Sequence, residues 1–352
     1  MRFEVLSSTP LTATEGSGTF VAIDGLVRGL RSLGHEAAVR PLRLRTRFHT
    51  LDRLAYNVAV AATPPRADVV VGVDLDGFLW AARRRRPAFV VALKGVIADE
   101  LRNERGVVRA LLAVQAAWER ASCARADRVV VPSRYSADVA AAAYGIPPDR
   151  IAIVPEPIDL EGWRRLFREA RGGPAERPTV LSVARMYARK RLEDLLEAAS
   201  LLVARIPRVQ LRIVGEGPES ARLRALHARL GLGDHVVFLG EMSRRGLAVE
   251  YVRAHCFCLP SVQEGFGLVL AEAMAAGLPI VACRAAAVPE VVADRHSGLL
   301  VTPRRPDELA AALEALLMDE GLRKDLGDEG RRRVEAFAPA RVAARFVEAL
   351  PA

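Results

Sequence analysis

The sequence predicts an α/β protein with two doubly wound domains, each built on a parallel sheet. Short runs rich in valine and isoleucine alternate with longer amphipathic stretches through almost all of the 352 residues. Alternation of this kind is typical of parallel sheets that carry helices on both faces. The length suits two domains of about 100 to 200 residues each. A break rich in proline and glycine near the middle of the chain separates two such sets of runs.

In the first half, short apolar runs have the length and β-branched composition of buried strands. These expected strands are residues 2–7, 68–73, 89–94, 128–132 and 151–154. Residues 105–125 are longer and mix apolar with charged residues, so we expect a helix there.

The second half repeats this arrangement. Its expected strands are residues 179–184, 210–214, 235–239, 256–259, 279–282 and 299–301. Its expected helices are residues 192–205, 219–230 and 306–317. Ligands of open α/β sheets bind beyond the carboxyl ends of the strands, so two such domains facing each other would hold substrates in the cleft between them.

The break begins at Pro155 and ends at Pro178. It predicts a first domain over residues 1–160, a hinge over residues 161–177 and a second domain over residues 178–335. We expect residues 336–352 to form a C-terminal helix that packs back on the first domain.

Composition and charge exclude several classes of protein. Hydrophobic residues make up 51% of the chain and charged residues 26%, which is too apolar for a disordered protein. No apolar run approaches the roughly 18 residues of a spanning helix, and the N-terminus lacks the pattern of a signal peptide. The net charge of +9 is spread over both halves and aromatic residues are only 5%, which argues against a nucleic-acid partner.

Cysteine usage indicates a reducing compartment. The four cysteines lie in apolar stretches without a CxxC pair, at Cys123, Cys256, Cys258 and Cys283. They suit buried thiols and imply neither a disulfide nor a metal framework. We therefore expect a cytoplasmic protein.

The sharpest motif runs from Glu264 to Glu272 and follows an apolar strand. Gly265 and Gly267 permit a tight turn and a close approach of the backbone to a ligand. The helix that starts there offers free N–H groups and a partial positive charge, which together attract an anion. The two glutamates beside it are suited to accept hydrogen bonds from sugar hydroxyls. The alternative is a plain glycine-rich turn with two surface glutamates.

Two cations follow the strand at residues 179–184. Arg185 ends the strand and Lys190 opens the next helix, so both are expected at the carboxyl edge, where they can neutralise a diphosphate. Lys190 is notable because the chain has three lysines and 48 arginines. For Arg185 the alternative is an ordinary solvated charge.

Two glycine turns give weaker signals. Gly215 and Gly217 follow the strand at residues 210–214, and Gly16 and Gly18 follow the first strand. Each pair is consistent with an anion-binding turn or with an ordinary loop.

In this order the motifs resemble the retaining glycosyltransferases of family 4, which have the GT-B fold of two facing Rossmann-like domains. The resemblance implies that Arg185 and Lys190 grip the donor diphosphate, that Glu272 holds the nucleotide ribose and that Glu264 contacts the sugar. It also implies that the donor phosphates lie on the backbone amides of Gly265, Phe266, Gly267 and Leu268. The nucleotide base is expected near Met242, within residues 240–243.

The chain departs from the family pattern at several positions. The family usually has glycine just before the arginine and just after the lysine, where this chain has Ala184 and Arg191. Many relatives also carry a histidine after the strand that matches residues 68–73, and this chain has Asp74 there instead. Any role of that histidine is absent or supplied elsewhere.

Asp74 and Asp76 also have the spacing of the DxD metal motif found in the other glycosyltransferase fold. We reject that interpretation because Arg185, Lys190 and a helix terminus already supply charge for the leaving group without a metal. Asp76 and Lys94 are instead candidate acceptor-side residues, with solvated charges at strand ends as the alternative.

The resemblance implies transfer of a sugar from a UDP- or GDP-sugar to an acceptor hydroxyl with retention of the anomeric configuration and no cofactor. The acceptor is an unspecified glycan, lipid-linked or small molecule. A nucleotide-sugar epimerase and a non-catalytic nucleotide-sugar-binding protein are alternatives. Two runs of the first half are rich in arginine. They consist of Arg40, Arg43, Arg45, Arg47 and Arg53, and of residues 83–86. They suggest peripheral contact with the inner face of a membrane, or else a solvated surface.

Overall fold

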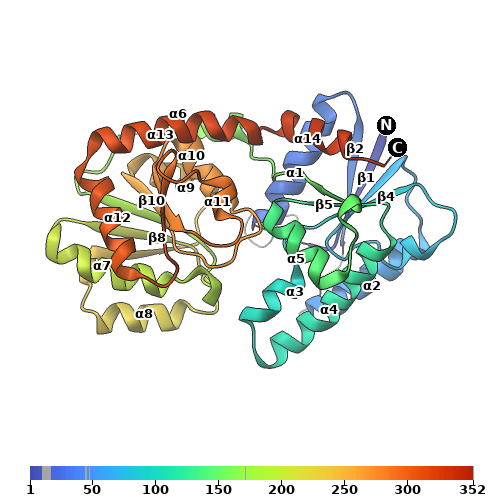
Figure 1. Ribbon diagram of the computed structural model, residues 1–352, viewed down its shortest axis with the longest axis horizontal. Coiled ribbons are helices and arrows are strands. Elements are labelled where there is room, and N and C mark those ends of the chain that lie inside the picture. The colour runs from blue at the N-terminus through green and yellow to red at the C-terminus, as the bar shows by residue number, and fades with distance from the viewer. Residues whose placement is uncertain (10–16, 44–45, 47, 171, 352) are drawn as a thin grey trace. The chain divides into compact units, whose positions relative to one another are not determined.

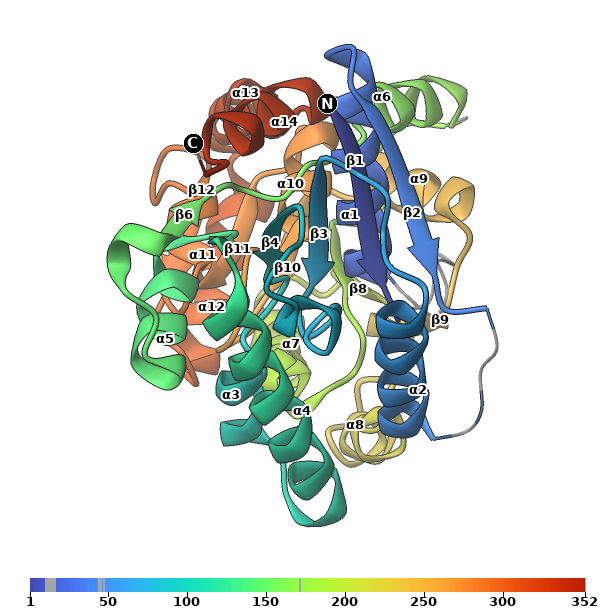
Figure 2. The same ribbon diagram turned by 90° about the vertical axis from the view of Figure 1, so that its right-hand side faces the viewer.

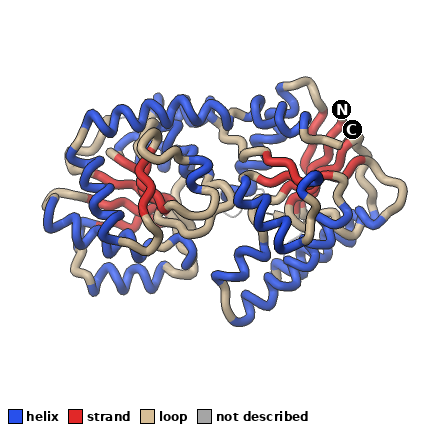
Figure 3. Tube along the Cα trace, viewed as in Figure 1, coloured by secondary structure: helices blue, strands red, loops and turns tan. Residues whose placement is uncertain are grey.

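The computed structural model describes residues 1–9, 17–43, 46, 48–170 and 172–351 (Figure 1). The chain divides into two compact units. Unit 1 comprises residues 1–158 and 337–352, and unit 2 comprises residues 159–336. Each unit has one six-stranded parallel sheet between helices, so the predicted pair of Rossmann-like domains is confirmed (Figure 3).

The sheet of unit 1 has the strand order β2-β1-β3-β4-β5-β6, and all of its pairs are parallel. Figure 2 shows β2, β1, β3 and β4 side by side in this order. The strands are β1 (Arg2–Ser7), β2 (Glu36–Pro41), β3 (Val69–Val73), β4 (Ala88–Ala92), β5 (Arg128–Val131) and β6 (Ile151–Ile153).

Helices cover both faces of this sheet because successive residues of each strand point to opposite sides. Val5 and Val71 face α1 and α14, whereas Leu6 and Val70 face α2, α4 and α5. The helices of unit 1 are α1 (Ser17–Ser32), α2 (His49–Ala62), α3 (Ile97–Glu100), α4 (Gly106–Arg125), α5 (Arg134–Tyr144) and α14 (Pro339–Glu348), with 3-10 turns η1 (Trp80–Ala82), η2 (Leu101–Asn103) and η3 (Pro148–Arg150).

The C-terminal helix α14 packs on α1, so the two ends of the sequence share one unit. The contact is close, because a Cβ atom on Gly29 of α1 would lie 2.2 Å from the carbonyl oxygen of Pro339. Phe346 is buried against Phe3 of β1, with ring centroids 6.5 Å apart.

Unit 2 repeats the architecture with the strand order β12-β11-β10-β7-β8-β9. Its strands are β7 (Thr179–Val183), β8 (Gln210–Val214), β9 (Val236–Gly240), β10 (Cys256–Leu259), β11 (Ile280–Cys283) and β12 (Gly298–Val301). Its helices are α6 (Leu160–Glu169), α7 (Leu192–Arg205), α8 (Ser220–Arg229), α9 (Arg244–Arg253), α10 (Leu268–Ala276), α11 (Val288–Val291), α12 (Pro306–Met318) and α13 (Glu320–Val334), with 3-10 turns η4 (Ala188–Lys190), η5 (Gly233–His235) and η6 (Glu335–Phe337), which reaches into unit 1.

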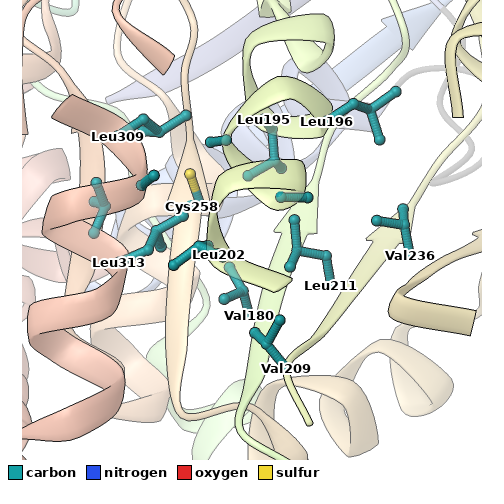
Figure 4. Packing of buried hydrophobic residues seen from close by; sticks show 14 of the residues in the cluster. Val180, Leu195, Leu196, Leu202, Val209, Leu211, Val236, Cys258, Leu309 and Leu313 are labelled. Atoms are coloured by element: carbon teal, nitrogen blue, oxygen red, sulfur yellow. The ribbon is translucent and has the colours of Figure 1, made fainter. Parts of the chain in front are cut away.

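The largest core of unit 2 lies between the sheet and the helices α7 and α12. Leu195 and Leu202 of α7 and Leu313 of α12 pack over Val180 and Cys258 of the strands (Figure 4). This layer fixes the carboxyl ends of β7 and β10, where the predicted donor residues follow.

Two elements differ from the expectation. Strand β2 is not among the expected strands, because its sequence holds only one β-branched residue. Residues 161–177, expected as a hinge, begin with α6, whose Trp163 is buried in unit 2. No helix in the described ranges is long and apolar enough to span a bilayer.

Candidate functional site

The carboxyl edge of the unit 2 sheet gathers most of the predicted donor residues. Arg185 follows β7 after one residue, Gly215 directly follows β8, and Glu264 lies in the loop between β10 and α10. A backbone hydrogen bond joins the segments that follow β7 and β10, since the Val262 N–H donates to the carbonyl of Arg189 at 3.0 Å.

Lys190 and Glu264 meet at the centre of this edge. The Lys190 ammonium donates to Glu264 Oε1 at 2.5 Å, and both side chains are largely buried. Burial by itself raises the pKa of Glu264, but the charges of Lys190 and Arg189 outweigh it and hold the pKa below its usual value. Glu264 is therefore an ionised acceptor at neutral pH.

The loop after Glu264 turns sharply into α10. Gly267 is the residue before the helix and has φ +88, a left-handed conformation that suits glycine. A Cβ atom there would lie 2.8 Å from Leu270 Cδ1. Phe266 is buried, while Gly265 and Leu268 are half-buried. The nine-residue helix α10 begins four residues after Glu264, and its amino-terminal N–H groups carry a partial positive charge.

Arg185 adds exposed positive charge to the same edge. Its guanidinium carbon lies 5.5 Å from the centre of the Tyr187 ring, and that of Arg189 lies 5.4 Å from the same ring. No ion pair joins Arg185 to Glu264 among the residues that the structure describes.

The departure at Arg191 has a structural explanation. Its φ is +52, the conformation that the family's glycine would adopt at no cost. Its guanidinium is paired with Asp194 at 2.5 Å and with Glu193 at 2.7 Å. The Arg191 charge is thus neutralised within α7 and adds little to an anion site.

The glycine turn after β8 is built for close backbone packing. A Cβ atom on Gly215, which has φ +119, would lie 2.2 Å from the carbonyl oxygen of Ala184. One on Gly217 would lie 2.7 Å from the backbone of Met186. Met242, expected near the base, is half-buried before α9.

Glu272 sits apart from the ion pair, in the second turn of α10. It is buried and accepts a hydrogen bond from the Tyr251 hydroxyl at 3.0 Å. Burial raises its pKa to about 7, while the Tyr251 hydrogen bond and the Arg244 charge act in the opposite direction. Sequence reasoning missed Tyr251 and Arg244, because both come from α9 and only the fold brings them to α10.

Arg244 is itself fixed by the start of unit 2. It forms an ion pair with Asp159 Oδ2 at 2.7 Å and lies 4.7 Å from the centre of the Trp163 ring. Asp159 also caps α6 by accepting from the Gly162 N–H at 3.1 Å. The start of α6 therefore positions Arg244, the cation that lowers the pKa of Glu272.

In unit 1, Asp76 is buried and hydrogen-bonded, and its acceptor-side role stays a prediction. It is 1% exposed and accepts hydrogen bonds from the Ser8 N–H at 2.6 Å and from the Ser8 hydroxyl at 2.8 Å. Asn57 donates to it at 3.3 Å. These contacts fix the orientation of the carboxylate.

Lys94 and Asp74 lie at the same carboxyl edge of unit 1. Lys94 is paired with Glu156 at 2.8 Å, a partner that the sequence did not indicate. Asp74 has φ +54 and accepts from the Lys94 N–H at 2.8 Å. Gly18 lies in the first turn of α1, and Gly16 is outside the described residues.

Two arginines of the basic runs form ion pairs within unit 1. Arg40 is paired with Glu4 at 2.6 Å, and Arg86 with Asp127 at 2.6 Å. Arg45 and Arg47 are outside the described residues. Within the described ranges no group of three or more His, Cys, Asp or Glu side chains is arranged to hold a metal ion.

Two family models match the chain in succession. Residues 37–162 match the model of Glycosyltransferase Family 4, and residues 164–333 match that of Glycosyl transferases group 1.

Curated relatives match over part of the chain. The D-inositol 3-phosphate glycosyltransferase of Streptomyces bingchenggensis is 34% identical over 226 residues, which are 60% of this chain and 50% of the relative. The GDP-mannose-dependent alpha-(1-6)-phosphatidylinositol monomannoside mannosyltransferase of Mycobacterium tuberculosis is 32% identical over 60% of this chain and 57% of its own length. The chain thus spans about half the length of these relatives.

Solved structures share the fold over nearly the whole chain. Sucrose-phosphate synthase from Thermosynechococcus elongatus has a TM-score of 0.81 at 22% identity and covers 99% of this chain and 97% of its own. The Anabaena protein HepE in complex with UDP-glucose has a TM-score of 0.76 at 18% identity, over 99% of this chain and 98% of its own.

Proposed function

The chain belongs to the group 1 glycosyltransferases, and on that basis we propose that it transfers a sugar from a nucleotide diphosphate sugar to an acceptor hydroxyl with retention of configuration. The observation that carries this proposal is the Lys190–Glu264 pair beside the amino-terminal end of α10. UDP-glucose in the HepE structure and GDP-mannose in the name of the mycobacterial relative support a UDP- or GDP-sugar donor.

In the proposed mechanism, unit 2 binds the donor and stabilises its departing diphosphate. The bond from the anomeric carbon to the phosphate oxygen breaks, and negative charge develops on that oxygen. Arg185, Lys190 and the amides of residues 265–268 stabilise this charge more in the transition state than in the ground state. The acceptor oxygen bonds to the anomeric carbon on the same face and gives its proton to the phosphate oxygen.

Glu264 and Glu272 hold the two polyol parts of the donor. Ionised Glu264 accepts hydrogen bonds from the sugar hydroxyls and Glu272 from the ribose hydroxyls. Because the leaving-group charge is met by side-chain cations and backbone amides, we propose that turnover needs no metal, so that a chelator leaves the rate unchanged.

Activity measurements test the proposal through Arg185. The wild-type protein is incubated with UDP-glucose or GDP-mannose and a panel of acceptors that includes D-inositol 3-phosphate, and product configuration is read from the anomeric coupling constant by NMR. We expect Arg185→Ala to lower kcat about 100- to 1000-fold, as loss of an oxyanion donor does. Arg295→Ala, in an exposed turn of unit 2, is the control. An unchanged kcat in Arg185→Ala would rule out the assignment.

We also propose that unit 1 contacts a membrane surface through α4. Val107, Leu111 and Val114 recur at helical spacing and are 75%, 46% and 44% exposed, and Arg105 and Arg109 flank them. Apolar side chains beside cations suit the interface of an anionic bilayer. Flotation with anionic liposomes should be lost in Leu111→Glu, and equal flotation of this variant and wild type would refute the contact.

A further inference from the structure

Unit 1 has a charged cavity at the edge of its sheet where β4 and β5 begin. Its volume is about 520 Å³. The walls come from the end of η1, from the segment that leads into β4 and from the end of α4. The residues that line it are Ala81, Ala82, Arg83, Arg84, Arg86, Arg125 and Asp127. Four guanidinium groups thus surround a single carboxylate.

Arg86 forms a fixed part of the wall. Its two terminal nitrogens contact Asp127 at 2.6 and 3.0 Å, and one of them also donates to the carbonyl of Arg125 at 2.7 Å. Its guanidinium carbon lies 5.6 Å from the centre of the Phe89 ring. The only carboxylate that lines the cavity is therefore already engaged by Arg86.

Among the residues that the structure describes, no carboxylate forms an ion pair with Arg83, Arg84 or Arg125. Arg83 donates to the carbonyl of Ala61 at 2.6 Å, and Arg125 donates to the carbonyl of Phe78 at 3.2 Å. Arg84 is exposed and forms no ion pair with any residue in the ranges that the structure describes. Most N–H groups of these guanidiniums remain available to a ligand.

We propose that this cavity binds a phosphate-bearing anion. Like charges gathered in a concave site repel one another, and a bound anion of two or more charges offsets that repulsion. A phosphomonoester carries about −1.5 to −2 charges and three acceptor oxygens, which match three guanidinium forks better than a single carboxylate does.

The site is separate from the acceptor-side residues of the same unit. β4 connects the two, with Arg86 before it and Lys94 after it, and eight residues at about 3.3 Å each place them roughly 26 Å apart. A ligand in the cavity therefore lies away from the carboxyl edge of the sheet. A soluble phosphorylated compound and a lipid headgroup both offer this chemistry.

The test uses inorganic pyrophosphate in isothermal titration calorimetry and phosphatidylcholine vesicles with or without phosphatidic acid in flotation. All proteins carry Arg185→Ala and Leu111→Glu, which weaken the proposed donor site and remove the proposed α4 contact while the buried Lys190–Glu264 pair stays intact. Arg84→Ala is compared with Arg85→Ala. The two residues are adjacent and exposed, and each substitution removes one positive charge, but Arg85 does not line the cavity.

We expect Arg84→Ala to weaken binding about tenfold or more and Arg85→Ala to weaken it less than about twofold. This pattern with pyrophosphate identifies a soluble ligand, and the same pattern with phosphatidic acid vesicles alone identifies a lipid headgroup. The double variant Arg83→Ala/Arg84→Ala should abolish binding of the responding probe. If Arg84→Ala and Arg85→Ala behave alike with both probes, or if neither probe binds, the proposal is overturned.

Discussion

Lys190 and Glu264 form an ion pair that is largely shielded from water. The side chains are 13% and 8% exposed, so either charge would be costly to bury without the other. The sequence indicated both residues, because a rare lysine after one strand and a glutamate before a glycine turn were expected at the same sheet edge. It could not indicate the direct contact, which depends on the conformation of two loops.

Removal of Lys190 should therefore destabilise unit 2. We expect Lys190→Met to lower the free energy of unfolding by about 3 to 5 kcal/mol, because Glu264 keeps a buried charge without a partner. Arg205→Ala, which breaks the more exposed pair with Glu314, is the control and should cost less than about 1 kcal/mol. Urea unfolding measures both, and an equal loss would contradict the buried-pair account.

The same pair predicts how stability depends on pH. The pKa of Glu264 is lower in the folded protein than its usual 4.5, so the unfolded chain binds the proton more tightly. The contribution to stability is complete above pH 4.5 and is lost as the pH falls through the folded pKa. Glu264→Gln should flatten the acid limb of a plot of unfolding free energy against pH. An unchanged acid limb would speak against the depressed pKa.

The raised pKa of Glu272 predicts that donor binding depends on pH near neutrality. Its pKa is raised to about 7, and a ribose hydroxyl is bound best by the ionised form. Affinity for UDP-glucose should therefore rise about tenfold from pH 6 to pH 8. Calorimetry at both pH values should show this rise in wild type and its absence in Glu272→Gln. Tyr251→Phe removes a hydrogen bond that lowers the pKa, so it should move the midpoint to higher pH.

At the level of elements, the turn after β8 is shaped by glycine and packs against the segment after β7. Gly215 has φ +119, and any side chain would collide with the Ala184 carbonyl. The sequence placed this turn correctly after a strand, because strand length and glycine position are local properties. It did not indicate β2, which is stabilised by pairing with β1 and not by its own composition.

Substitution of Gly215 tests whether this turn is as tight as the structure shows. Gly215→Ala should cost about 3 kcal/mol or more, since steric overlap adds to backbone strain. Gly231→Ala is the matched control, because Gly231 also has a positive φ of +62 but has nothing within 4 Å of its Cβ position, so only about 1 to 2 kcal/mol is expected. Similar losses in the two variants would show that the overlap with Ala184 is relieved.

At the scale of the whole molecule, the chain returns to unit 1 after it has built unit 2. The sequence indicated two domains and a terminal helix, because apolar periodicity and a proline-rich break are visible in one dimension. The partners of Asp76 and Lys94 could not be predicted, since both depend on which strand ends become neighbours in the sheet.

Truncation of Phe346 should destabilise unit 1 selectively. Phe346→Ala removes a buried ring from the layer between α14, α1 and the sheet, which should cost about 3 to 5 kcal/mol. Arg341→Ala, on the exposed side of α14, should cost less than about 0.5 kcal/mol. Hydrogen exchange should speed up in α1 and β1 of Phe346→Ala and stay unchanged in β7 and β8. Equal acceleration in both units would contradict this division.

We propose that unit 2 binds a nucleotide diphosphate sugar at the carboxyl edge of its sheet. A crystal structure of the protein with UDP-glucose or GDP-mannose would show the ligand itself. We expect the diphosphate against Arg185, Lys190 and the amides of residues 265–268, with Glu272 on the ribose and Glu264 on the sugar. A diphosphate bound elsewhere, with the Lys190–Glu264 pair untouched by the ligand, would contradict it.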